Sequence, residues 1–516
     1  MVFQGKGMSL AIVESRATVG VESVAVRVEV HVGSGLPTFS IVGLPDTGVR
    51  ESRERVRAAI VSSGFDFPAG RITVNLAPAD LPKAACWFDL PIALGILMAS
   101  GQVATSNELG HPDKPVDIKG WVFVGNLSLT GEVPPINDPL SVALSIARQY
   151  PAACLVMGDD SARLAAVVPD VQIYGVHSLS QVVACLAGGQ PWVPVASAAA
   201  PINMGSTVGV ECLADVRGQT FAKRALEVAA AGSHSLLMVG APGTGKSMLA
   251  SRLPGLLPEL SRYQVLEVAA LRARDKAGLF LSTVAPFRAP HHSTSVPALV
   301  GGGAVPRPGE ITRAHHGVLF LDELPEFERR VIESLREPLE TAHVTISRAR
   351  YAVRFPASFQ LVAAMNPCPC GWAGHPSHVC RCTPERVEQY RSRLSGPFLD
   401  RLDLQISVAP VPKGWLDLPE GETSEQVKAR VVQARARQLQ RQGVVNAKLQ
   451  ASELLKYVDL SGEAHAMLSQ GAQQWGWSAR VMHRLMRVAR TVADLAGSRH
   501  VNGSHVAEAV QFRQAW

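Results

Sequence analysis

The segment Gly240-Ala241-Pro242-Gly243-Thr244-Gly245-Lys246-Ser247 decides the fold of this 516-residue chain. It has the spacing G-x-x-x-x-G-K-S, an apolar run at residues 235–239 precedes it, and a helix-like segment at 248–257 follows it. The glycines let backbone N–H groups close around phosphates, Lys246 can reach the β- and γ-phosphates, and Ser247 can offer its hydroxyl to Mg²⁺. This order of strand, loop and helix predicts a binding site for ATP at a helix N-terminus.

A second apolar run, residues 317–321, ends in the acids Asp322 and Glu323. Phosphoryl transfer needs charge neutralisation and a positioned nucleophile more than covalent help. We therefore expect Asp322 to support Mg²⁺ together with Ser247, and Glu323 to orient and deprotonate the attacking water. A solvated acidic turn is the alternative interpretation of this pair. Together the two motifs predict an ATPase.

The composition is that of a large cytoplasmic protein with several domains. Lys and Arg number 50 against 44 Asp and Glu, so the net charge of +6 identifies no partner by itself. With 47% hydrophobic residues, the chain can form buried cores, and its length predicts about three domains. No apolar stretch approaches about 18 residues, and the start lacks a signal-peptide pattern, so we expect neither membrane spanning nor secretion.

Breaks in composition divide the chain into four parts. We expect an N-terminal domain at residues 1–188, a linker rich in Pro, Ala and Ser at 189–209, an ATPase domain at 210–410 and a helical C-terminal domain at 411–516. Strand-like runs at 235–239, 317–321 and 359–364 alternate with helical segments, which predicts an α/β fold with a parallel sheet covered on both faces. The helices predicted after residue 423 are 424–442, 452–457, 462–470, 478–496 and 504–514.

Four of the eight cysteines lie close together in the pattern C-x-C, nine residues, C-x-C. They are Cys368, Cys370, Cys380 and Cys382. Four thiolates at this spacing can surround one structural Zn²⁺ ion. The alternatives that remain open are reduced thiols without a metal, and a redox site or a site assisted by His375 or His378. The other cysteines, Cys86, Cys154, Cys185 and Cys212, are interpreted as core residues.

Several segments strongly resemble the YifB/ComM family of magnesium-chelatase-like AAA+ proteins. They are FRAPHHS at 287–293, GGG at 301–303, PRPGEI at 306–311, AHHGVLFLDELPEF at 314–327 and MNPCPCG at 365–371, with IVGLP at 41–45 and FDLPIAL at 88–94. The resemblance covers nearly the whole chain. It implies an AAA+ P-loop domain with a C-terminal helical lid, preceded by an α+β domain like the Lon protease and the second domain of ribosomal protein S5.

The resemblance also assigns further residues to the ATPase site. Asn366 looks like sensor 1, which hydrogen-bonds the γ-phosphate or the attacking water, Arg401 like the arginine finger, and Arg480 like sensor 2. A guanidinium is always ionised and suits the charge that develops on the phosphate. If Arg401 is supplied by a neighbouring subunit, the resemblance implies a ring, and a hexamer is expected. Taken singly, each arginine also fits an ordinary surface position.

Two basic segments are candidates for DNA contacts. Residues 341–355 alternate like a hairpin, and relatives carry a pore-facing insertion there, so Arg348, Arg350 and Arg354 would face a central channel. The glycine-rich insert at 300–308, with Arg288 and Arg307 nearby, would form a second pore loop. A charged, solvated hairpin edge is the alternative. Two other basic stretches, 428–441 and the arginines at 50, 53, 55 and 57, fit solvated helix faces at least as well.

The first domain lacks the residues that proteolysis needs. In Lon-like proteases a serine follows a Pro-Lys pair by four residues, and a lysine comes later. Here Pro82-Lys83 is followed at that spacing by Trp87, and the later segment 129–140 contains no lysine. A serine nucleophile requires a base to activate it, so the domain is expected to be catalytically degenerate. The neighbouring Cys86 is interpreted as a packed core thiol.

Three functions follow from the resemblance. The leading one is a hexameric ATPase that drives branch migration of recombination intermediates during natural transformation, acting on single-stranded and branched DNA made with RecA. The second is a chelatase-type motor that remodels a metal-inserting protein. The third is an unfoldase coupled to its own protease-like domain, which the missing serine and lysine oppose.

Overall fold

The computed structural model describes residues 2–5, 8–43, 47–78, 87–103, 118–196, 211–273, 280–303, 306–348, 351–410, 414 and 417–513. The chain divides into two compact units. The first is Met1–Ile202, Val265–Leu281 and Ser347–Arg354, and the second is Asn203–Gln264, Ser282–Ile346 and Phe355–Trp516. Among the described helices, none has the length and apolar character that crossing a membrane requires.

The first unit contains a mixed sheet with the strand order β4-β5-β3-β2-β6-β7-β8, and β1 pairs with β2. The strands are β1 (Val2–Gly5), β2 (Met8–Val19), β3 (Glu22–Gly33), β4 (Thr38–Val42), β5 (Arg71–Ala77), β6 (Trp121–Phe123), β7 (Cys154–Gly158) and β8 (Gln172–Val176). The pairings β5–β3 and β3–β2 are antiparallel, whereas β4–β5 and the run β2–β6–β7–β8 are parallel.

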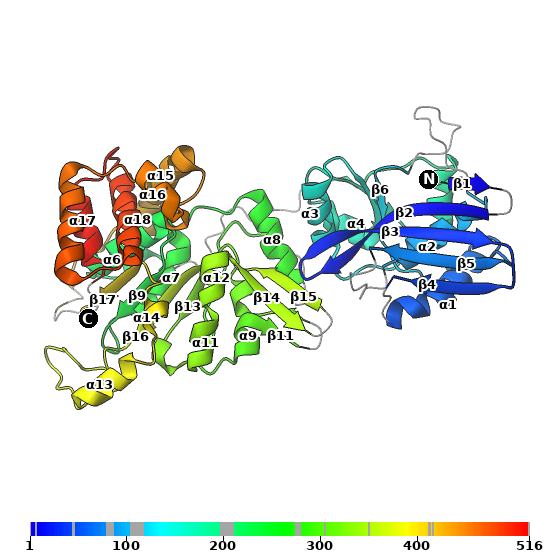
Figure 1. Cartoon of the computed structure of the whole chain (residues 1–516). Helices are drawn as coiled ribbons and strands as arrows, with labels where there is room; N and C mark the ends of the chain where they lie inside the picture. Colours follow the sequence, from blue (N-terminus) through cyan, green and yellow to red (C-terminus); the bar gives the residue numbers. More distant parts are fainter. Residues whose placement is uncertain are drawn as a thin grey trace. The chain divides into compact units, whose positions relative to one another are not determined.

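In the first unit, buried side chains alternate along the strands, and helices pack against the sheet. On β3, Val26, Val28 and Val30 are fully buried, because alternate side chains of a strand face the same side of a sheet. Helix α2 is buried along its whole length and packs against β2 and β3 (Figure 1). The helices of this unit are α1 (Thr47–Ser62), α2 (Asp89–Ala99), α3 (Pro139–Gln149), α4 (Asp159–Ala165) and α5 (Leu179–Leu186).

The start of the expected linker packs onto the first unit. The N–H of Val195 donates to the carbonyl of Ile173 at 2.7 Å. The ring of Trp192 lies 4.6 Å from that of Trp121, measured between centroids. The packing of this unit therefore continues beyond residue 188, while residues 197–210 lie outside the described part of the chain.

The second unit is built on a parallel sheet with the order β10-β13-β16-β9-β17. Its strands are β9 (Leu236–Val239), β10 (Phe287–Arg288), β13 (Val318–Leu321), β16 (Gln360–Met365) and β17 (Leu404–Ser407). All four pairings are parallel, which confirms the predicted α/β fold with a parallel sheet. Because β16 lies between β9 and β13, three loops that were far apart in sequence leave the same edge of the sheet side by side. In open α/β sheets, ligands bind outside this carboxyl edge.

Two small hairpins accompany this sheet. The first pairs β11 (Gly301–Gly302) with β12 (Arg307–Pro308) and contains the glycine-rich insert. The second pairs β14 (His343–Arg348) with β15 (Tyr351–Pro356) and confirms the hairpin predicted at 341–355. Helix α8 (Arg262–Ala273) and this second hairpin contain residues of both units.

The helices after residue 423 confirm the predicted helical C-terminal region. The helix predicted at 424–442 is α15 to the residue, and the other four differ from their predictions by a few residues. The helices of the second unit are α6 (Thr220–Gly232), α7 (Lys246–Leu256), α9 (Val296–Val300), α10 (Glu310–Arg313), α11 (Arg329–Ser334), α12 (Arg336–Thr341), α13 (Pro384–Arg391), α14 (Gly396–Leu399), α15 (Ser424–Gln442), α16 (Ala451–Tyr457), α17 (Gly462–Trp475), α18 (Ala479–Leu495) and α19 (Gly503–Gln511). Short 3-10 turns are η1 (Leu213–Asp215), η2 (Leu324–Glu326) and η4 (Asn446–Lys448).

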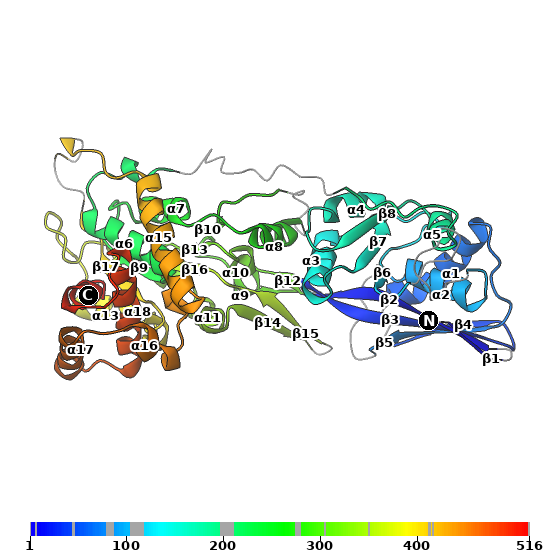
Figure 2. The ribbon, with the colours of Figure 1, turned by 90° about the horizontal axis from the view of Figure 1, so that it is seen from above.

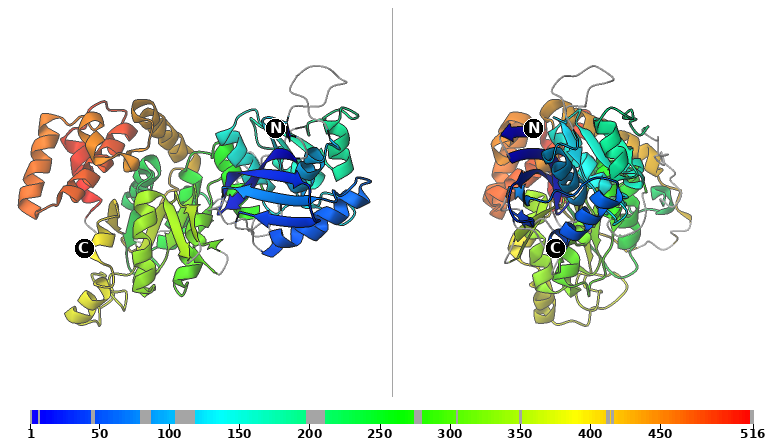
Figure 3. Two further views of the ribbon diagram at one scale, coloured as in Figure 1. Left: turned by 45° about the vertical axis from the view of Figure 1, so that its right-hand side comes forward. Right: turned by 90° about the vertical axis from the view of Figure 1, so that its right-hand side faces the viewer.

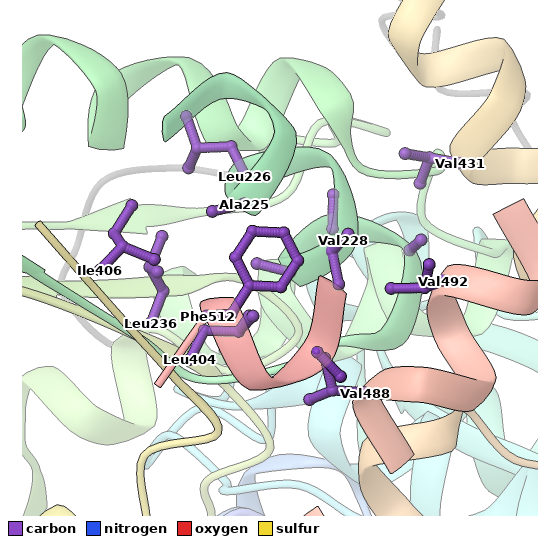
Figure 4. Packing of buried hydrophobic residues seen from close by; sticks show 14 of the residues in the cluster. Ala225, Leu226, Val228, Leu236, Leu404, Ile406, Val431, Val488, Val492 and Phe512 are labelled. Atoms are coloured by element: carbon purple, nitrogen blue, oxygen red, sulfur yellow. The ribbon is translucent and has the colours of Figure 1, made fainter. Parts of the chain in front are cut away.

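One hydrophobic cluster joins the sheet to the C-terminal helices. The ring of Phe512, just after α19, lies beside Leu236, Leu404 and Ile406 of the sheet (Figure 4). The long helix α15 runs along α6 and α7 (Figure 2), and α16 to α19 form the orange and red group in Figure 3. The C-terminal helices therefore share a core with the nucleotide-binding sheet, and the boundary expected at residue 410 stays a prediction.

Candidate nucleotide-binding site

The loop Gly240 to Gly245 connects β9 to α7 and has the backbone that a phosphate-binding loop needs. Gly243 and Gly245 have φ of +77° and +86°, a region that favours glycine. A Cβ at Gly240 would lie 2.7 Å from the carbonyl oxygen of Val408, so a side chain would not fit there. Helix α7 begins at Lys246, and its N-terminal N–H groups and dipole favour an anion at this point.

Lys246 is held inside the loop by three oxygen acceptors. Its Nζ donates to the carbonyls of Gly240 and Ala241 at 2.7 Å and 2.9 Å, and to Asn366 Oδ1 at 3.2 Å. Burial lowers the pKa of Lys246, an effect that the nearby carboxylates of Asp322 and Glu323 oppose. The phosphates of a nucleotide would supply the negative charge that a buried ammonium group requires.

The predicted Mg²⁺ partners face each other. The hydroxyl of Ser247, in the first turn of α7, donates to Asp322 Oδ2 at 2.5 Å. Asp322 directly follows β13, so its carboxylate lies at the carboxyl edge of the sheet. A hydroxyl and a carboxylate are hard oxygen ligands that fit Mg²⁺, which also takes oxygens from water and phosphate.

Glu323 has a partner that the sequence analysis missed. It has a left-handed backbone, with φ of +51°, and its Oε2 lies 3.1 Å from His292 Nδ1. His292 belongs to the segment that follows β10, and β10 pairs with β13. The two residues are 31 positions apart in sequence, and their proximity follows from strand order. The sequence feature that could have identified His292 is the His291-His292 pair, which closely follows the strand in the 287–293 motif.

These side chains surround one cavity of about 380 Å³. It is lined by Pro242, Gly243, Thr244, Gly245, Lys246, Ser247, Met248, Asp322, Glu323, Met365 and Asn366. Asn366 directly follows β16, the strand that lies between β9 and β13 in the sheet. The structure therefore brings the P-loop, both acids and Asn366 together, as the predicted ATPase chemistry requires.

Arg401 and Arg480 lie elsewhere. Both line a second cavity of about 540 Å³, together with Ser235, Gln360 and Asp403. Ser235 and Asp403 precede β9 and β17, and Gln360 is the first residue of β16, so this cavity lies at the amino edge of the parallel sheet. The P-loop leaves the opposite, carboxyl edge. Within one chain, these two arginines and the phosphate-binding loop are thus on opposite edges of the sheet.

The loop that carries Arg401 is fixed by a buried polar network. Ser235 Oγ and Arg484 Nη1 both donate to the Arg401 carbonyl, at 3.0 Å and 2.9 Å, and Arg484 also forms an ion pair with Asp403. Burial raises the pKa of Asp403, but Arg484 and His234 outweigh burial and hold it below its usual value. The Arg401 guanidinium itself contacts Glu340, with Nη2 2.5 Å from Oε1.

Two of the predicted DNA-contact residues meet in a third cavity of about 590 Å³. Arg288 and Arg307 both line it, and Arg307 is exposed on β12. Arg288 Nε lies 2.7 Å from Glu310 Oε2, so a phosphate would compete with this carboxylate. On the larger hairpin, Arg354 is exposed on β15. Arg350 and the side chain of Arg348 lie outside the described part of the structure.

The four clustered cysteines face one another. Cys368 Sγ lies 3.4 Å from Cys370 Sγ and 3.6 Å from Cys380 Sγ, and Cys370 and Cys380 are also 3.6 Å apart. The four sulfurs lie within 4.8 Å of one another. A tetrahedral zinc with bonds of about 2.3 Å places its sulfurs about 3.8 Å apart, so the group fits Zn²⁺.

Several of the remaining basic candidates form ion pairs within the protein. On α15, Arg430 pairs with Glu227 and Glu422, and Arg441 pairs with Asp494. In the first unit, Arg55 pairs with the buried Asp89. These contacts favour the interpretation of both stretches as ordinary helix faces.

The residues that were compared with the protease motif lie only partly within the described part of the chain. Trp87 is buried, while Pro82, Lys83 and Cys86 lie outside the described residues. Of the other predicted core cysteines, Cys185 is buried and Cys154 and Cys212 are partly buried.

Comparison with known proteins shows which family this chain resembles. The family described as magnesium chelatase, subunit ChlI, matches residues 212–416, its C-terminal part matches 421–513, and subunit ChlI of Mg-chelatase matches 28–159. Competence protein ComM of Haemophilus influenzae is 45% identical over 513 residues, which cover 98% of each chain. YifB of Salmonella typhimurium is 44% identical over 98% of this chain and 97% of its own. The magnesium-chelatase 38 kDa subunit of Cereibacter sphaeroides is 27% identical over 169 residues, 29% of this chain and 51% of its own.

Proposed function

This chain belongs to the YifB/ComM family of magnesium-chelatase-like proteins, and on that premise we propose that it is an AAA+ ATPase that drives the branch migration of DNA. One observation carries the ATPase part. Lys246, Ser247, Asp322, Glu323 and Asn366, which come from three separate loops, line a single cavity. No other cavity described above combines a phosphate-binding loop with a metal-binding pair and a general base.

The proposed roles follow from charge and position. The P-loop N–H groups and Lys246 hold the β- and γ-phosphates, while Ser247 and Asp322 hold Mg²⁺. Glu323 accepts a proton from the attacking water, and Asn366 positions that water or the γ-phosphate. Mg²⁺, when bound, neutralises the charge that develops on the transferred phosphoryl group.

We further propose that the site is completed by a second copy of this chain. Arg401 and Arg480 line a cavity at the edge of the sheet opposite to the P-loop. Their guanidinium groups can reach a γ-phosphate only if that phosphate is bound by a neighbouring subunit. Such a head-to-tail contact repeats around a closed ring, and we propose six copies. Arg401 is the finger of this composite site, and Arg480 the second sensor.

DNA is the proposed substrate of the motor. Arg288 and Arg307 gather around one cavity beside the glycine-rich insert, and Arg354 is exposed on the hairpin. Together with Arg348 and Arg350, they would grip the phosphate backbone without reading its sequence. Since the relative from Haemophilus influenzae is a competence protein, we propose a role in natural transformation, on single-stranded and branched DNA intermediates made with RecA. The first domain, which we regard as Lon-protease-like and catalytically degenerate, would organise the ring or contact DNA.

A structural Zn²⁺ ion in the four-cysteine loop completes the proposal. The sulfur spacing fits a tetrahedral site, and a reducing compartment keeps thiols available for metal. ATP, DNA and reduced thiols together support a cytoplasmic location.

The second candidate is a chelatase-type ATPase that remodels a metal-inserting protein. It is favoured because all three family models that match this chain describe the magnesium chelatase subunit ChlI. The two candidates share the ATPase site and differ in substrate, so activity on DNA distinguishes them.

The deciding experiment uses purified full-length protein, labelled three- and four-strand DNA junctions, ATP and Mg²⁺. We expect strand exchange that requires ATP, and none with Lys246→Ala, which removes the ammonium group from the phosphate site. Equal exchange by wild type and Lys246→Ala would reject the motor. ATP hydrolysis that DNA leaves unchanged, without strand exchange, would favour the chelatase-type alternative.

A further inference from the structure

The four-cysteine loop connects two parts of the nucleotide site. It begins after Asn366, at the end of β16, and ends at Thr383, whose side chain accepts a hydrogen bond from the Arg386 N–H at the start of α13. Cys368 is fully buried two residues after Asn366, and Cys382 directly precedes Thr383. A metal ion bound by the four sulfurs would therefore fix both ends of this loop.

The loop touches the P-loop directly. Gly371 has φ of +83°, and a Cβ placed on it would lie 2.6 Å from Pro242 Cδ and 3.9 Å from Asn366 Cγ. The N–H of Gly371 donates to the carbonyl of Cys368 at 2.9 Å, so the turn that brings Gly371 to Pro242 starts at a cysteine of the cluster. Only glycine fits this contact, because it combines a left-handed backbone with close approach to a proline ring.

Asn366 is also held from the far side of the loop. The backbone of Asn366 faces the hydroxyl of Tyr390, a buried residue of α13, and lowers the pKa of that phenol against the larger effects of burial and of Glu326, which raise it. The Arg391 side chain donates to the carbonyl of Pro367 at 3.4 Å. Both contacts come from the helix that the second cysteine pair leads into. Asn366 in turn accepts a hydrogen bond from Lys246. The cysteine cluster is thus connected to Asn366 through Cys368 on one side and through α13 on the other.

We propose that a Zn²⁺ ion held by Cys368, Cys370, Cys380 and Cys382 sets the positions of Pro242 and Asn366, so that ATP turnover depends on metal occupancy. The inference rests on the proposed ATPase function and adds a controlling site to it. Without the metal, the loop keeps its sequence but loses the four bonds that fix its turn. A displacement of about 1 Å in a catalytic group lowers the rate by up to about a hundredfold. A shift of Asn366 by this distance is therefore sufficient to lower ATP turnover by about tenfold or more.

The test compares metal-loaded and metal-free full-length protein. Zinc per chain is measured by elemental analysis, and Zn²⁺ is removed with a mercurial and a chelator and then restored. We expect one Zn²⁺ per chain, a fall in kcat of about tenfold or more on removal, and recovery when Zn²⁺ is added back. The affinity for a fluorescent ATP analogue and hydrogen exchange at residues 366–371 are measured in the same samples, and both should change with the metal.

Variants distinguish control of ATP turnover by the metal from a loss of folding. Cys380→Ser/Cys382→Ser should lose zinc and turnover, and added Zn²⁺ should not rescue it, whereas Cys154→Ser/Cys185→Ser, in the first unit, should behave as wild type. Gly371→Ala keeps all four ligands, so it should keep its zinc and still lose about tenfold in kcat because the added methyl group displaces Pro242 or Asn366. Gly371→Ala remains informative even if the double cysteine variant unfolds.

The inference is overturned if the protein binds no zinc, if metal-free protein keeps the nucleotide affinity and kcat of the loaded form, or if Gly371→Ala is unaffected. Failure of the proposed function gives a different result, because the zinc-loaded wild type would then fail to hydrolyse ATP. In that case nucleotide affinity and hydrogen exchange at residues 366–371 still decide whether the metal fixes the loop.

Discussion

His292 Nδ1 lies 3.1 Å from Glu323 Oε2, and this contact places an imidazole against the proposed general base. The two residues leave neighbouring parallel strands, β10 and β13, at the same edge of the sheet. The ring of His292 also contacts that of His291, with centroids 4.0 Å apart and the planes tilted by 35°, and the segment continues into α9 and the glycine-rich hairpin. The position of Glu323 is thus tied to a segment that also carries the proposed DNA-contact residues Arg288 and Arg307.

We expect His292→Ala to lower kcat for ATP by about tenfold while the affinity for nucleotide stays the same, because His292 orients the base and does not line the phosphate site. Glu323→Gln should be more severe, by about 10² to 10⁴, since it removes the base itself. Steady-state hydrolysis and binding of a fluorescent ATP analogue measure the two quantities. His292→Asn keeps a hydrogen-bond donor and should retain more turnover than His292→Ala. Normal turnover in His292→Ala would leave the contact without a catalytic role.

The buried Asp403 gives a prediction about pH and stability. It contacts His234, Ser235 and Arg484 at the amino edge of the sheet, and the charge of Arg484 and His234 holds its pKa below its usual value against the effect of burial. A lowered pKa in the folded state means that the carboxylate stabilises the fold above the unfolded pKa. This stabilisation is lost as pH falls through the folded pKa.

Asp403→Asn should therefore lower the free energy of unfolding at pH 7 by about 3 to 5 kcal/mol, because it leaves the partners of a buried charge uncompensated. The difference between wild type and variant should narrow below about pH 4, where the unfolded carboxyl is protonated. Denaturant titrations at pH 7 and at about pH 3, below the unfolded pKa, measure both values. A difference that stays constant between these pH values would show that the charge of Asp403 contributes nothing.

The proposed DNA contacts predict a change in salt dependence. Arg307→Ala and Arg354→Ala each remove one exposed cation, so each should reduce the slope of log K against log salt by about 0.7 to 0.9 for a lost phosphate contact. ATP hydrolysis without DNA should not change. The matched control is Arg163→Ala, an exposed arginine on α4 of the first unit. Fluorescence anisotropy with labelled single strands at several salt concentrations gives the slopes, and equal slopes for all four proteins would remove these arginines from the interface.

The parts of the site that the sequence predicts are those carried by short motifs. The P-loop, the acids after β13 and Asn366 after β16 depend on local order, and the structure brings them together at one sheet edge. His292 was missed because its proximity to Glu323 depends on which strands pair. The contact of Gly371 with Pro242 was missed for a similar reason, since it joins loops separated by more than a hundred residues. Arg55 was a candidate for an exposed face, yet it pairs with Asp89, which only the packing of α1 on α2 brings near.

Arg401 shows the limit of motif reasoning most clearly. The family resemblance assigns Arg401 a role in hydrolysis. A sequence motif does not tell whether this arginine acts at the P-loop of its own chain or at the P-loop of a neighbouring chain. That question depends on the edge of the sheet from which the loop leaves. Asp403 precedes β17, whereas Ser247 and the P-loop follow β9, and these two strands are parallel. Arg401 and the phosphate-binding loop of one chain therefore lie at opposite edges of the sheet.

Mixing inactive variants tests whether Arg401 acts on a neighbouring subunit. Arg401→Ala and Lys246→Ala should each abolish turnover, because one loses the transition-state cation and the other the phosphate ligand. In a ring of randomly mixed subunits, a site is complete when a chain with intact Lys246 meets a neighbour with intact Arg401, so a 1:1 mixture should recover about a quarter of wild-type turnover per site. If Arg401 served its own P-loop, no mixed site would be complete and activity would stay at zero. The control mixes wild type with the double variant Lys246→Ala/Arg401→Ala, for which the neighbour arrangement predicts about a quarter of full activity and the single-chain arrangement about half. Arg480→Ala in place of Arg401→Ala should give the same pattern, since both arginines line the same cavity at the amino edge of the sheet.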